Sequence, residues 1–237
     1  MKIVTWNVNS IRARLENVVE WLSVTKPDIL LLQELKCEES SFPKGPIEDL
    51  GYNVAIAGQK AYNGVAILSK SPIEDVVIGL PTYPEDENSR YIEAVVGTTR
   101  VASVYVPNGQ AVGSEKYQYK LTFLERFREH LASILLFEEA TVIGGDYNIA
   151  PENRDVAQPE FWEGKILCSP AERQHYQAFL HLGYYDALRL HHEGPGPSTW
   201  WDYRSGAWQN DLGLRIDHFL LSPLAVDRVQ ASGVERG

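Results

Sequence analysis

The sequence is poor in cysteine and methionine, and it has no long apolar run. Its 237 residues include 2 cysteines and 1 methionine. The cysteines, Cys37 and Cys168, are too few for a disulfide framework, so a reducing cytoplasm is the expected location. No apolar stretch approaches the roughly 20 residues that cross a bilayer. The first ten residues, MKIVTWNVNS, turn polar too early for a signal peptide.

Basic side chains are also scarce relative to acidic ones. There are 22 Lys and Arg against 32 Asp and Glu, which gives a formal net charge of −10. This balance excludes a protein that binds nucleic acid through general positive charge, but it permits a local basic strip or a bound metal. No repeat, low-complexity tract or long linker divides the chain, so we expect a single domain over residues 1–237.

The N-terminal segment has the pattern of a strand, a helix and a second strand. Residues 2–7 are rich in β-forming side chains, and residues 28–34 contain an unbroken apolar run. Between them, Ser10 precedes apolar residues at helical spacing, so it is the predicted N-cap of an amphipathic helix. Two strands joined by a helix in this way are expected to be parallel neighbours in one sheet.

The rest of the chain mixes short β-rich segments with two clear helices. Ser169, Pro170 and Glu172 form a predicted helix start with a capping box, and that helix should end near His181. A longer helix is expected over residues 115–137. Strands are expected over residues 52–57, 64–69, 74–78, 91–96, 100–106, 141–144 and 214–221. This order predicts an α/β fold in which two mixed β-sheets pack face to face with helices outside.

Polar side chains stand where the first two predicted strands end. Asn7 and Asn9 follow the first strand, and Glu34 ends the second. If the strands are parallel neighbours, Asn7 and Glu34 lie a few ångströms apart at one sheet edge. A carboxylate with amide oxygens suits Mg²⁺ or Mn²⁺. The alternative is that these residues merely end strands and begin turns.

Two later segments show the same feature. Asp146 and Asn148 follow an apolar strand at a spacing that predicts projection from one face. Asp217 lies between apolar neighbours on a predicted strand, where an unpaired carboxylate is costly, so a histidine or a metal is its expected partner. His218 should point the other way, as a packing or surface residue.

The sequence resembles the exonuclease III family of apurinic/apyrimidinic (AP) endonucleases. Six segments occur in that family's order: WNVNSIRAR, LLLQELKC, NGVAILS, YVPNG, GGDYNIAP and LRIDHFLLS. The resemblance runs from residue 2 to about residue 222. It implies the endonuclease/exonuclease/phosphatase fold, a four-layer α/β/β/α sandwich.

The resemblance also implies roles for individual residues. The implied metal ligands are Asn7, Glu34 and the neighbouring Asn9, and the implied catalytic residues are Tyr105, Asp146, Asn148 and Asp217. Asp146 would orient or deprotonate the attacking water, Tyr105 and Asn148 would donate hydrogen bonds in the transition state, and Asp217 would orient a histidine. Trp200, Leu214 and Ile216 fall where the family forms the pocket for a flipped-out abasic sugar, although ordinary core packing is an alternative for Trp200. Arg12, Lys36, Tyr62 and Asn63 are candidate DNA contacts, with surface exposure or packing as the alternative.

One departure from the family pattern affects the expected activity. The family has a Ser-Asp-His motif shortly after the strand that holds Asp217, and the sequence through Gly237 contains none. We therefore expect a domain that lacks this segment and is weakly active or inactive as given.

The resemblance implies Mg²⁺-dependent hydrolysis of the phosphodiester 5′ to abasic sites in duplex DNA, by a cytoplasmic DNA-repair enzyme acting as a monomer. Removal of 3′ nucleotides and 3′ blocking groups is a further activity that it allows. Two alternatives remain open. One is a metal-dependent phosphatase of the same fold acting on inositol phosphates or sphingomyelin, and the other is an inactive DNA-binding protein.

Overall fold

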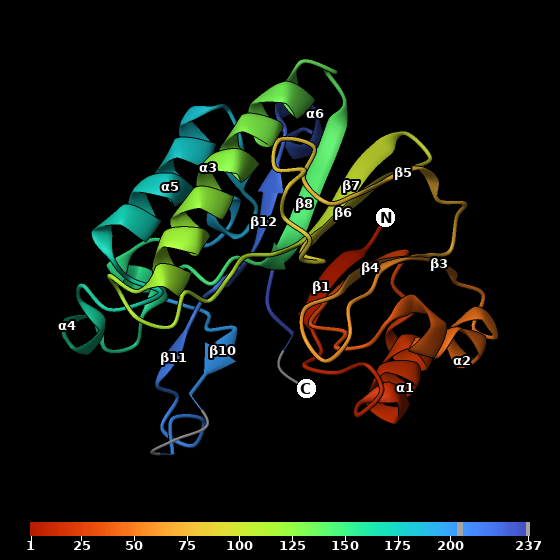
Figure 1. Cartoon of the computed structure of the whole chain (residues 1–237), viewed down its shortest axis with the longest axis horizontal. Coiled ribbons are helices and arrows are strands. Elements are labelled where there is room, and N and C mark those ends of the chain that lie inside the picture. Colours follow the sequence, from red (N-terminus) through yellow and green to blue (C-terminus); the bar gives the residue numbers. More distant parts are fainter. Residues whose placement is uncertain (203–205, 236–237) are drawn as a thin grey trace. The chain divides into compact units, whose positions relative to one another are not determined.

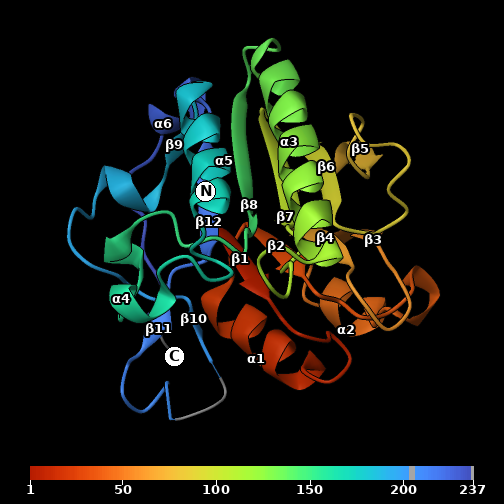
Figure 2. The same ribbon diagram turned by 60° about the vertical axis from the view of Figure 1, so that its left-hand side comes forward.

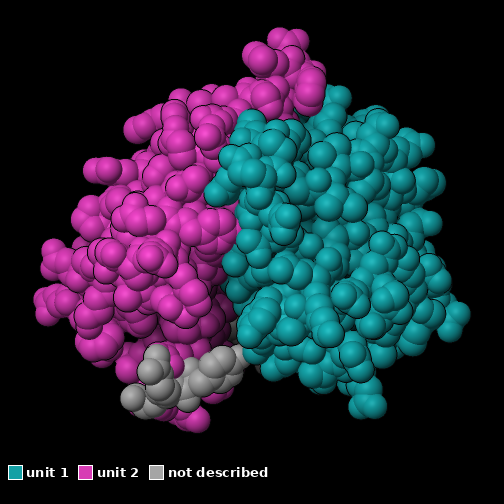
Figure 3. Space-filling model, viewed as in Figure 1, with its two compact units in different colours: residues 1–105, 139–146 teal, residues 106–138, 147–237 magenta. Residues whose placement is uncertain are grey.

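The computed structural model describes residues 1–202 and 206–235 (Figure 1). The chain divides into two compact units (Figure 3). Unit 1 comprises Met1–Tyr105 and Glu139–Asp146, and unit 2 comprises Val106–Glu138 and Tyr147–Gly237. No helix among the described residues is long and apolar enough to cross a membrane.

The first sheet of unit 1 is built on the predicted strand–helix–strand segment. Its strand order is β1-β2-β4-β3, with β1 at Ile3–Asn7, β2 at Ile29–Gln33, β4 at Val65–Ser69 and β3 at Asn53–Ala57. Strands β1 and β2 are parallel, and the other pairs are antiparallel. The helices α1 (Leu15–Thr25) and α2 (Lys44–Glu48) contribute Val18, Leu22 and Ile47 to one apolar cluster with Leu30, Leu32 and Leu68 of the sheet. These contacts place helices on the outer face of this sheet.

The second sheet of unit 1 packs against the first. It contains β5 (Glu74–Ile78), β6 (Tyr91–Val96), β7 (Thr99–Tyr105) and β8 (Ala140–Asp146), in that order, with β7 and β8 parallel. Buried Gln33 donates from Nε2 to Ser103 Oγ at 2.9 Å, and Ser103 Oγ donates to Leu32 O at 2.8 Å. These bonds join β2 of one sheet to β7 of the other. Two mixed sheets packed face to face, as the sequence predicts, are therefore confirmed.

Unit 2 is dominated by two long helices that pack side by side (Figures 1 and 2). These are α3 (Glu115–Leu135) and α5 (Pro170–His181). The rings of Phe127 and Phe179 pack edge to face between them, with 5.3 Å between the ring centroids. The predicted capping box of α5 is confirmed, because Glu172 N donates to Ser169 Oγ and Ser169 N donates to Glu172 Oε2. The remaining elements of unit 2 are short: α4 (Pro159–Trp162), β9 (Tyr185–Asp186), β10 (Trp200–Trp201), β11 (Gly213–Leu214), β12 (Asp217–Leu221) and α6 (Pro223–Val226). Single turns of 3-10 helix occur at Glu39–Ser41, Asn153–Asp155 and Leu188–Leu190.

Two expectations about element boundaries are wrong. Ser10 is not the N-cap of α1, which begins at Leu15 after Arg14. The Ser10 and Ile11 amides instead donate to Glu34 O and Leu35 O, so the chain still runs beside β2 there. The predicted strand over residues 214–221 is split into β11 and β12, because the Ile216 and Asp217 amides both donate to Thr199 Oγ1, at 3.0 and 3.1 Å.

Candidate active site

Three strand ends of unit 1 bring their polar side chains together. Asn7 ends β1, Glu34 follows β2, and Asp146 ends β8 of the other sheet. The Asn7 Nδ2 atom donates to Glu34 Oε1 and to Asp146 Oδ2, both at 2.9 Å. The predicted proximity of Asn7 and Glu34 is therefore confirmed, and Asp146 joins them. Two carboxylates that share one neutral donor form a centre with concentrated negative charge.

Glu34 remains ionised at neutral pH. Burial by itself raises its pKa, but the hydrogen bond from Asn7 and the bond and charge of Lys36 outweigh that effect and lower the pKa. The Lys36 Nζ atom lies 3.0 Å from Glu34 Oε2. Glu34 and Lys36 both have positive φ angles, of 52° and 54°, so the backbone leaves β2 in a tight twist between them.

Tyr105 supplies a neutral donor beside the same carboxylates. It ends β7 directly opposite Asp146 in the parallel register, and its phenol is hydrogen-bonded to Glu34. Burial raises the pKa of this phenol far above its ordinary value, and the charges of Glu34 and Asp146 raise it further. Tyr105 therefore keeps its proton at neutral pH and can act as a hydrogen-bond donor.

These side chains fit a hard divalent cation through oxygen ligands. Among residues 1–202 and 206–235, no group of three His, Cys, Asp or Glu side chains is placed to hold a metal ion, so the donors here are two carboxylates and an amide. Carboxylate and amide oxygens with bound waters are a common Mg²⁺ or Mn²⁺ environment. Of the predicted ligands, Glu34 presents its carboxylate directly.

The two predicted amide ligands make other contacts in this structure. Asn7 Oδ1 accepts from the backbone N–H of Asn9 at 3.0 Å. Asn7 would therefore have to rotate its side-chain amide to offer oxygen to a metal. Asn9 Oδ1 accepts from Lys36 Nζ. The Asn9 side-chain oxygen therefore binds the same ammonium group that pairs with Glu34.

The candidate DNA contacts of unit 1 differ in accessibility. Arg12 is exposed, and Tyr62 is 71% exposed. Asn63 is only 8% exposed, and its Nδ2 donates to Gln59 Oε1 at 2.9 Å and to Asn88 Oδ1 at 3.2 Å. Arg12 and Tyr62 are thus available to a ligand, whereas the Asn63 side chain is engaged within the fold.

Unit 2 holds Asn148 in a fixed conformation. Its Nδ2 donates to Val106 O at 2.9 Å, and its Oδ1 accepts from Asn108 Nδ2 at 3.2 Å. Strand β8 ends at Asp146, and Asn148 has a φ angle of 49°. The expectation that Asp146 and Asn148 project from one face by strand alternation is therefore wrong, because the strand does not extend to Asn148.

Asp217 and His218 begin β12 and have different surroundings. Asp217 is partly buried, and its amide bonds to Thr199. His218 is 2% exposed, lies against the rings of Tyr147 and Tyr176, and donates from Nε2 to Ile149 O at 2.7 Å. His218 is therefore a core packing residue, one of the two roles expected for it.

The three residues assigned to an apolar pocket do lie together in unit 2. Leu214 and Ile216 are buried in a cluster that Trp200 covers, and Trp200 pairs with Leu214 between β10 and β11. A further aromatic residue, Trp162, packs edge to face against the Trp200 ring, with 6.3 Å between the ring centroids. Trp162 was not predicted from the sequence, because it lies outside the six motifs.

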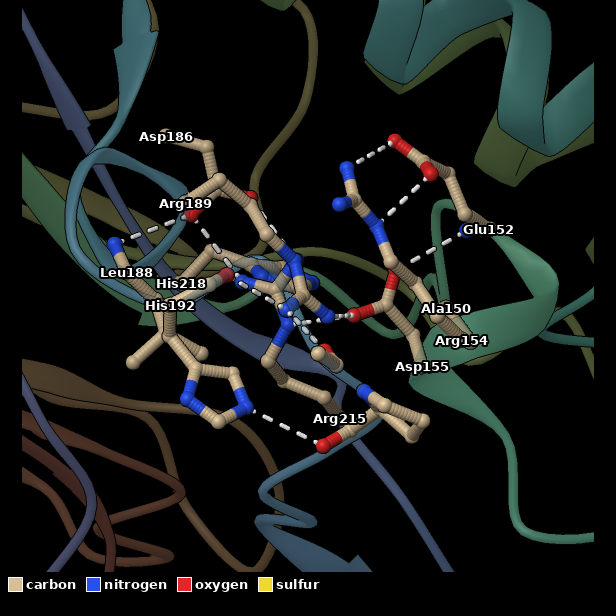
Figure 4. Close-up of polar contacts among 12 residues, drawn as sticks. Ala150, Glu152, Arg154, Asp155, Asp186, Leu188, Arg189, His192, Arg215 and His218 are labelled. Carbon is tan, nitrogen blue, oxygen red and sulfur yellow. Dashed lines mark hydrogen bonds and ion pairs between the residues drawn. The ribbon is translucent and has the colours of Figure 1, made fainter.

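A buried network of charges beside β12 was also missed (Figure 4). Arg215 donates to both carboxylate oxygens of Asp186, at 3.0 and 2.8 Å, and to Asp155 at 2.6 Å. Arg189 also pairs with Asp155. Burial alone raises the pKa of Asp186, but the charges of Arg215 and His218 lower it to about 2. An arginine between Leu214 and Ile216 in the sequence was the available signal, since a buried guanidinium requires carboxylate partners.

Comparison with known proteins extends over nearly the whole chain. Residues 4–237 match the model of the Endonuclease/Exonuclease/phosphatase family. Exodeoxyribonuclease III of Haemophilus influenzae is 32% identical over 99% of this chain and 92% of its own length. The structure of the 3′ phosphatase NExo from Neisseria, bound to a product DNA hairpin, is 44% identical with a TM-score of 0.92, covering 94% of this chain and 87% of that one. An AP endonuclease from Archaeoglobus fulgidus is 42% identical with a TM-score of 0.91, covering 96% and 88%.

Proposed function

The chain belongs to the Endonuclease/Exonuclease/phosphatase family, and we propose that it is a metal-dependent DNA-repair nuclease. Its proposed reaction is hydrolysis of the phosphodiester 5′ to an abasic site in duplex DNA, with removal of 3′ nucleotides and 3′ phosphates as a second activity. The observation that carries this proposal is the convergence of Asn7, Glu34 and Asp146 at the strand ends of unit 1. The names of the relatives, which include an exodeoxyribonuclease, a 3′ phosphatase and an AP endonuclease, support the same class of substrate.

Each side chain of this centre has a chemical task in the proposal. Asp146 accepts a hydrogen bond from the attacking water and orients it, because water is a weak nucleophile without a carboxylate beside it. Tyr105, which retains its proton, would turn its single O–H from Glu34 to the phosphoryl oxygens as negative charge builds on them. Asn148, two residues after Asp146 in the chain, is the second such donor. Asp217 is proposed to orient a histidine, the role that the resemblance implies for it.

Glu34, together with Asn7 after rotation of its amide, would hold the divalent metal. A bound Mg²⁺ supplies charge stabilisation to the phosphoryl and leaving oxygens. Lys36 pairs with Glu34 at 3.0 Å and keeps that carboxylate ionised and in place for the cation. Before that rotation, Asn7 Nδ2 donates to both carboxylates and holds Glu34 and Asp146 close together.

The substrate is tested by supplying three phosphate esters in parallel with Mg²⁺. These are a duplex with one tetrahydrofuran abasic analogue, a nicked duplex with a 3′ phosphate, and an inositol phosphate. Cleavage 5′ to the analogue supports the proposal, and release of the 3′ phosphate supports its second activity. Turnover of the inositol phosphate alone would overturn it in favour of a phosphatase. DNA binding with no turnover of any substrate would overturn it in favour of a binding protein.

The metal assignment is tested by Glu34→Gln. This change should raise the Mg²⁺ concentration for half-maximal rate by at least about tenfold, because a neutral amide is a weaker ligand than a carboxylate. Glu139→Gln is the matched control. Glu139 is also ion-paired, to Arg100 at 2.9 Å, but it directly precedes the first residue of β8, whereas Asp146 is the last residue of β8. An unchanged Mg²⁺ titration in Glu34→Gln would remove Glu34 from the metal site.

A further inference from the structure

The loop that follows β8 in unit 2 is held by side chains from three different elements. Its successive carbonyl oxygens at Asn148, Ile149 and Ala150 accept, respectively, from Lys120 Nζ at 2.6 Å, His218 Nε2 at 2.7 Å and Arg173 Nε at 3.0 Å. An irregular segment cannot satisfy its own backbone groups, so such donors replace the ladder bonds that a strand would provide. Of the three donors, Lys120 binds the residue that is proposed to donate to the substrate.

Lys120 is fully buried on α3, and its ammonium group binds two backbone oxygens and a carboxylate. Besides Asn148 O, Nζ donates to Asn108 O at 3.2 Å and to Glu172 Oε1. A buried ammonium is stable only when its charge and its N–H groups have partners. The carboxylate of Glu172 and the backbone oxygens of Asn108 and Asn148 serve as such partners here.

The carboxylate that neutralises Lys120 is itself fixed independently of Lys120. Glu172 stands in the first turn of α5, where Oε1 accepts from the Leu167 amide and Oε2 from the Ser169 amide, both at 3.1 Å. These bonds belong to the start of the helix and need no lysine. Glu172 therefore acts as an anchor that sets where the Lys120 ammonium stands.

The two backbone groups that Lys120 binds belong to residues whose side chains bind each other. Asn108 Nδ2 donates to Asn148 Oδ1 at 3.2 Å, and Asn148 Nδ2 donates one of its two N–H groups to Val106 O at 2.9 Å, so both ends of the Asn148 amide are held in one orientation. Gly109 leaves room for the lysine stem next to this pair. A Cβ at Gly109 would stand 3.1 Å from Lys120 Cδ and 3.0 Å from Ile166 Cδ1, at a φ of 88°.

We infer that Lys120 is a positioning residue that fixes the Asn108–Asn148 pair for catalysis. This inference rests on the proposed function, because it gives Asn148 the task of transition-state donor. Lys120 itself is buried and need not touch the substrate. It acts by holding two backbone segments at one point, so that the Asn148 amide has a single orientation. Misplacement of a reacting group by about 1 Å can cost roughly 100-fold in rate.

The test removes the ammonium without leaving a buried charge behind. The double variant Lys120→Met/Glu172→Gln should lower kcat by roughly 10- to 100-fold on the abasic duplex, with KM changed less than about twofold. Glu172→Gln alone keeps a side-chain oxygen beside the ammonium and both backbone acceptors, so it should lower kcat less than the double variant, while removal of the countercharge should make it less stable than the parent. In an Asn148→Ala background, the double change should cost less than about a further twofold, because the donor it positions is already gone.

A second buried ion pair provides the control. Arg100 and Glu93 in unit 1 are bonded at 2.9 Å, so Arg100→Met/Glu93→Gln is a matched removal of a pair on β6 and β7. It should lower stability while kcat of the folded enzyme stays near that of the parent. If the Lys120 double variant does not fold, Lys120→Arg takes its place. A planar guanidinium keeps the positive charge, but its N–H groups point in other directions than those of an ammonium.

The possible failures are distinguishable. If Asn148→Ala leaves kcat unchanged, the role of Asn148 in the proposed function is wrong, and the inference about Lys120 falls with it. A second outcome is that Asn148→Ala lowers kcat while the Lys120→Met/Glu172→Gln change lowers kcat by the same factor in Asn148→Ala as in the parent. In that case only the inference about Lys120 is overturned. A loss of stability or a rise in KM with unchanged kcat would likewise overturn it and leave the proposed function intact.

Discussion

Charged side chains are arranged in opposite ways in the two units. In unit 1, Glu34 and Asp146 converge on one neutral amide, with Lys36 paired to Glu34, so two like charges stand close together beside an ammonium. In unit 2, Asp155 and Asp186 each face the guanidinium of Arg215. Like charges held close raise the local energy and create a demand for a cation, whereas alternating charges satisfy each other. The first arrangement is suited to chemistry and the second to stability.

The same contrast appears in how the groups are ionised. The pKa of Asp186 falls to about 2 because the charge of Arg215 outweighs the effect of burial. The pKa of Tyr105 moves upward, through burial and then through the two carboxylates beside it. The network in unit 2 thus holds its charges firmly, while the centre in unit 1 resists a further negative charge. Replacing one charge in each region should therefore have opposite consequences for rate and for stability.

Asp146→Asn should produce the largest change in rate. Loss of the carboxylate that orients water should lower kcat by roughly 10²- to 10⁴-fold, with DNA affinity nearly unchanged. Stability should change by less than about 1 kcal/mol, because the substitution removes a repulsion between like charges. Single-turnover cleavage, a DNA titration and urea unfolding measure the three quantities. Asp28→Asn is the control, since Asp28 binds the Lys2 amide before β2 begins. A variant that cuts at the parent rate would remove Asp146 from the mechanism.

Arg215→Met should show the converse pattern. It leaves Asp186 and Asp155 buried without their shared guanidinium, and breaking such a group typically costs about 3–5 kcal/mol of unfolding free energy. Urea unfolding at pH 7 measures the loss. Adding Asp186→Asn to Arg215→Met should recover part of it, because one uncompensated charge is then removed. A loss below about 1 kcal/mol would show that the network contributes little to stability.

The sequence indicated the unit 1 centre because that centre depends on local rules. Apolar runs mark buried strands, parallel neighbours end at one edge, and Asn7 and Glu34 stand at those ends. The element pattern therefore also predicted the two sheets and the two long helices. It could not give the direction of the Asn7 amide, because that depends on Asp146, a partner far along the chain on the other sheet.

The sequence could not indicate the unit 2 network for the same reason. Arg215, Asp155 and Asp186 come from three separate segments, and no spacing rule connects them. Likewise, the split of the last strand depends on the Thr199 hydroxyl, which accepts two amides that a continuous strand would pair elsewhere. Such contacts follow from packing between distant segments rather than from periodicity.

His218 offers the smallest but most specific test of the unit 2 core. Burial, then the charge of Arg215, lowers its pKa from the ordinary 6.5 to about 4. The unfolded chain therefore binds a proton more readily than the folded one, so this contribution to stability is complete above about pH 6.5 and is lost as the pH falls toward 4. Between pH 7 and pH 5 the loss from this group should be about 2 kcal/mol.

Urea unfolding of the parent and of His218→Gln at the two pH values isolates this effect, because glutamine retains an N–H donor but does not titrate. The parent should lose about 2 kcal/mol more than the variant between pH 7 and pH 5. Asp186 should not contribute in this window, since its pKa is about 2 when folded and 3.8 ordinarily. Equal losses in the two proteins would mean that His218 is protonated as easily in the fold as outside it. The core of unit 2 would then accommodate an added positive charge, contrary to the balance of charges proposed for it.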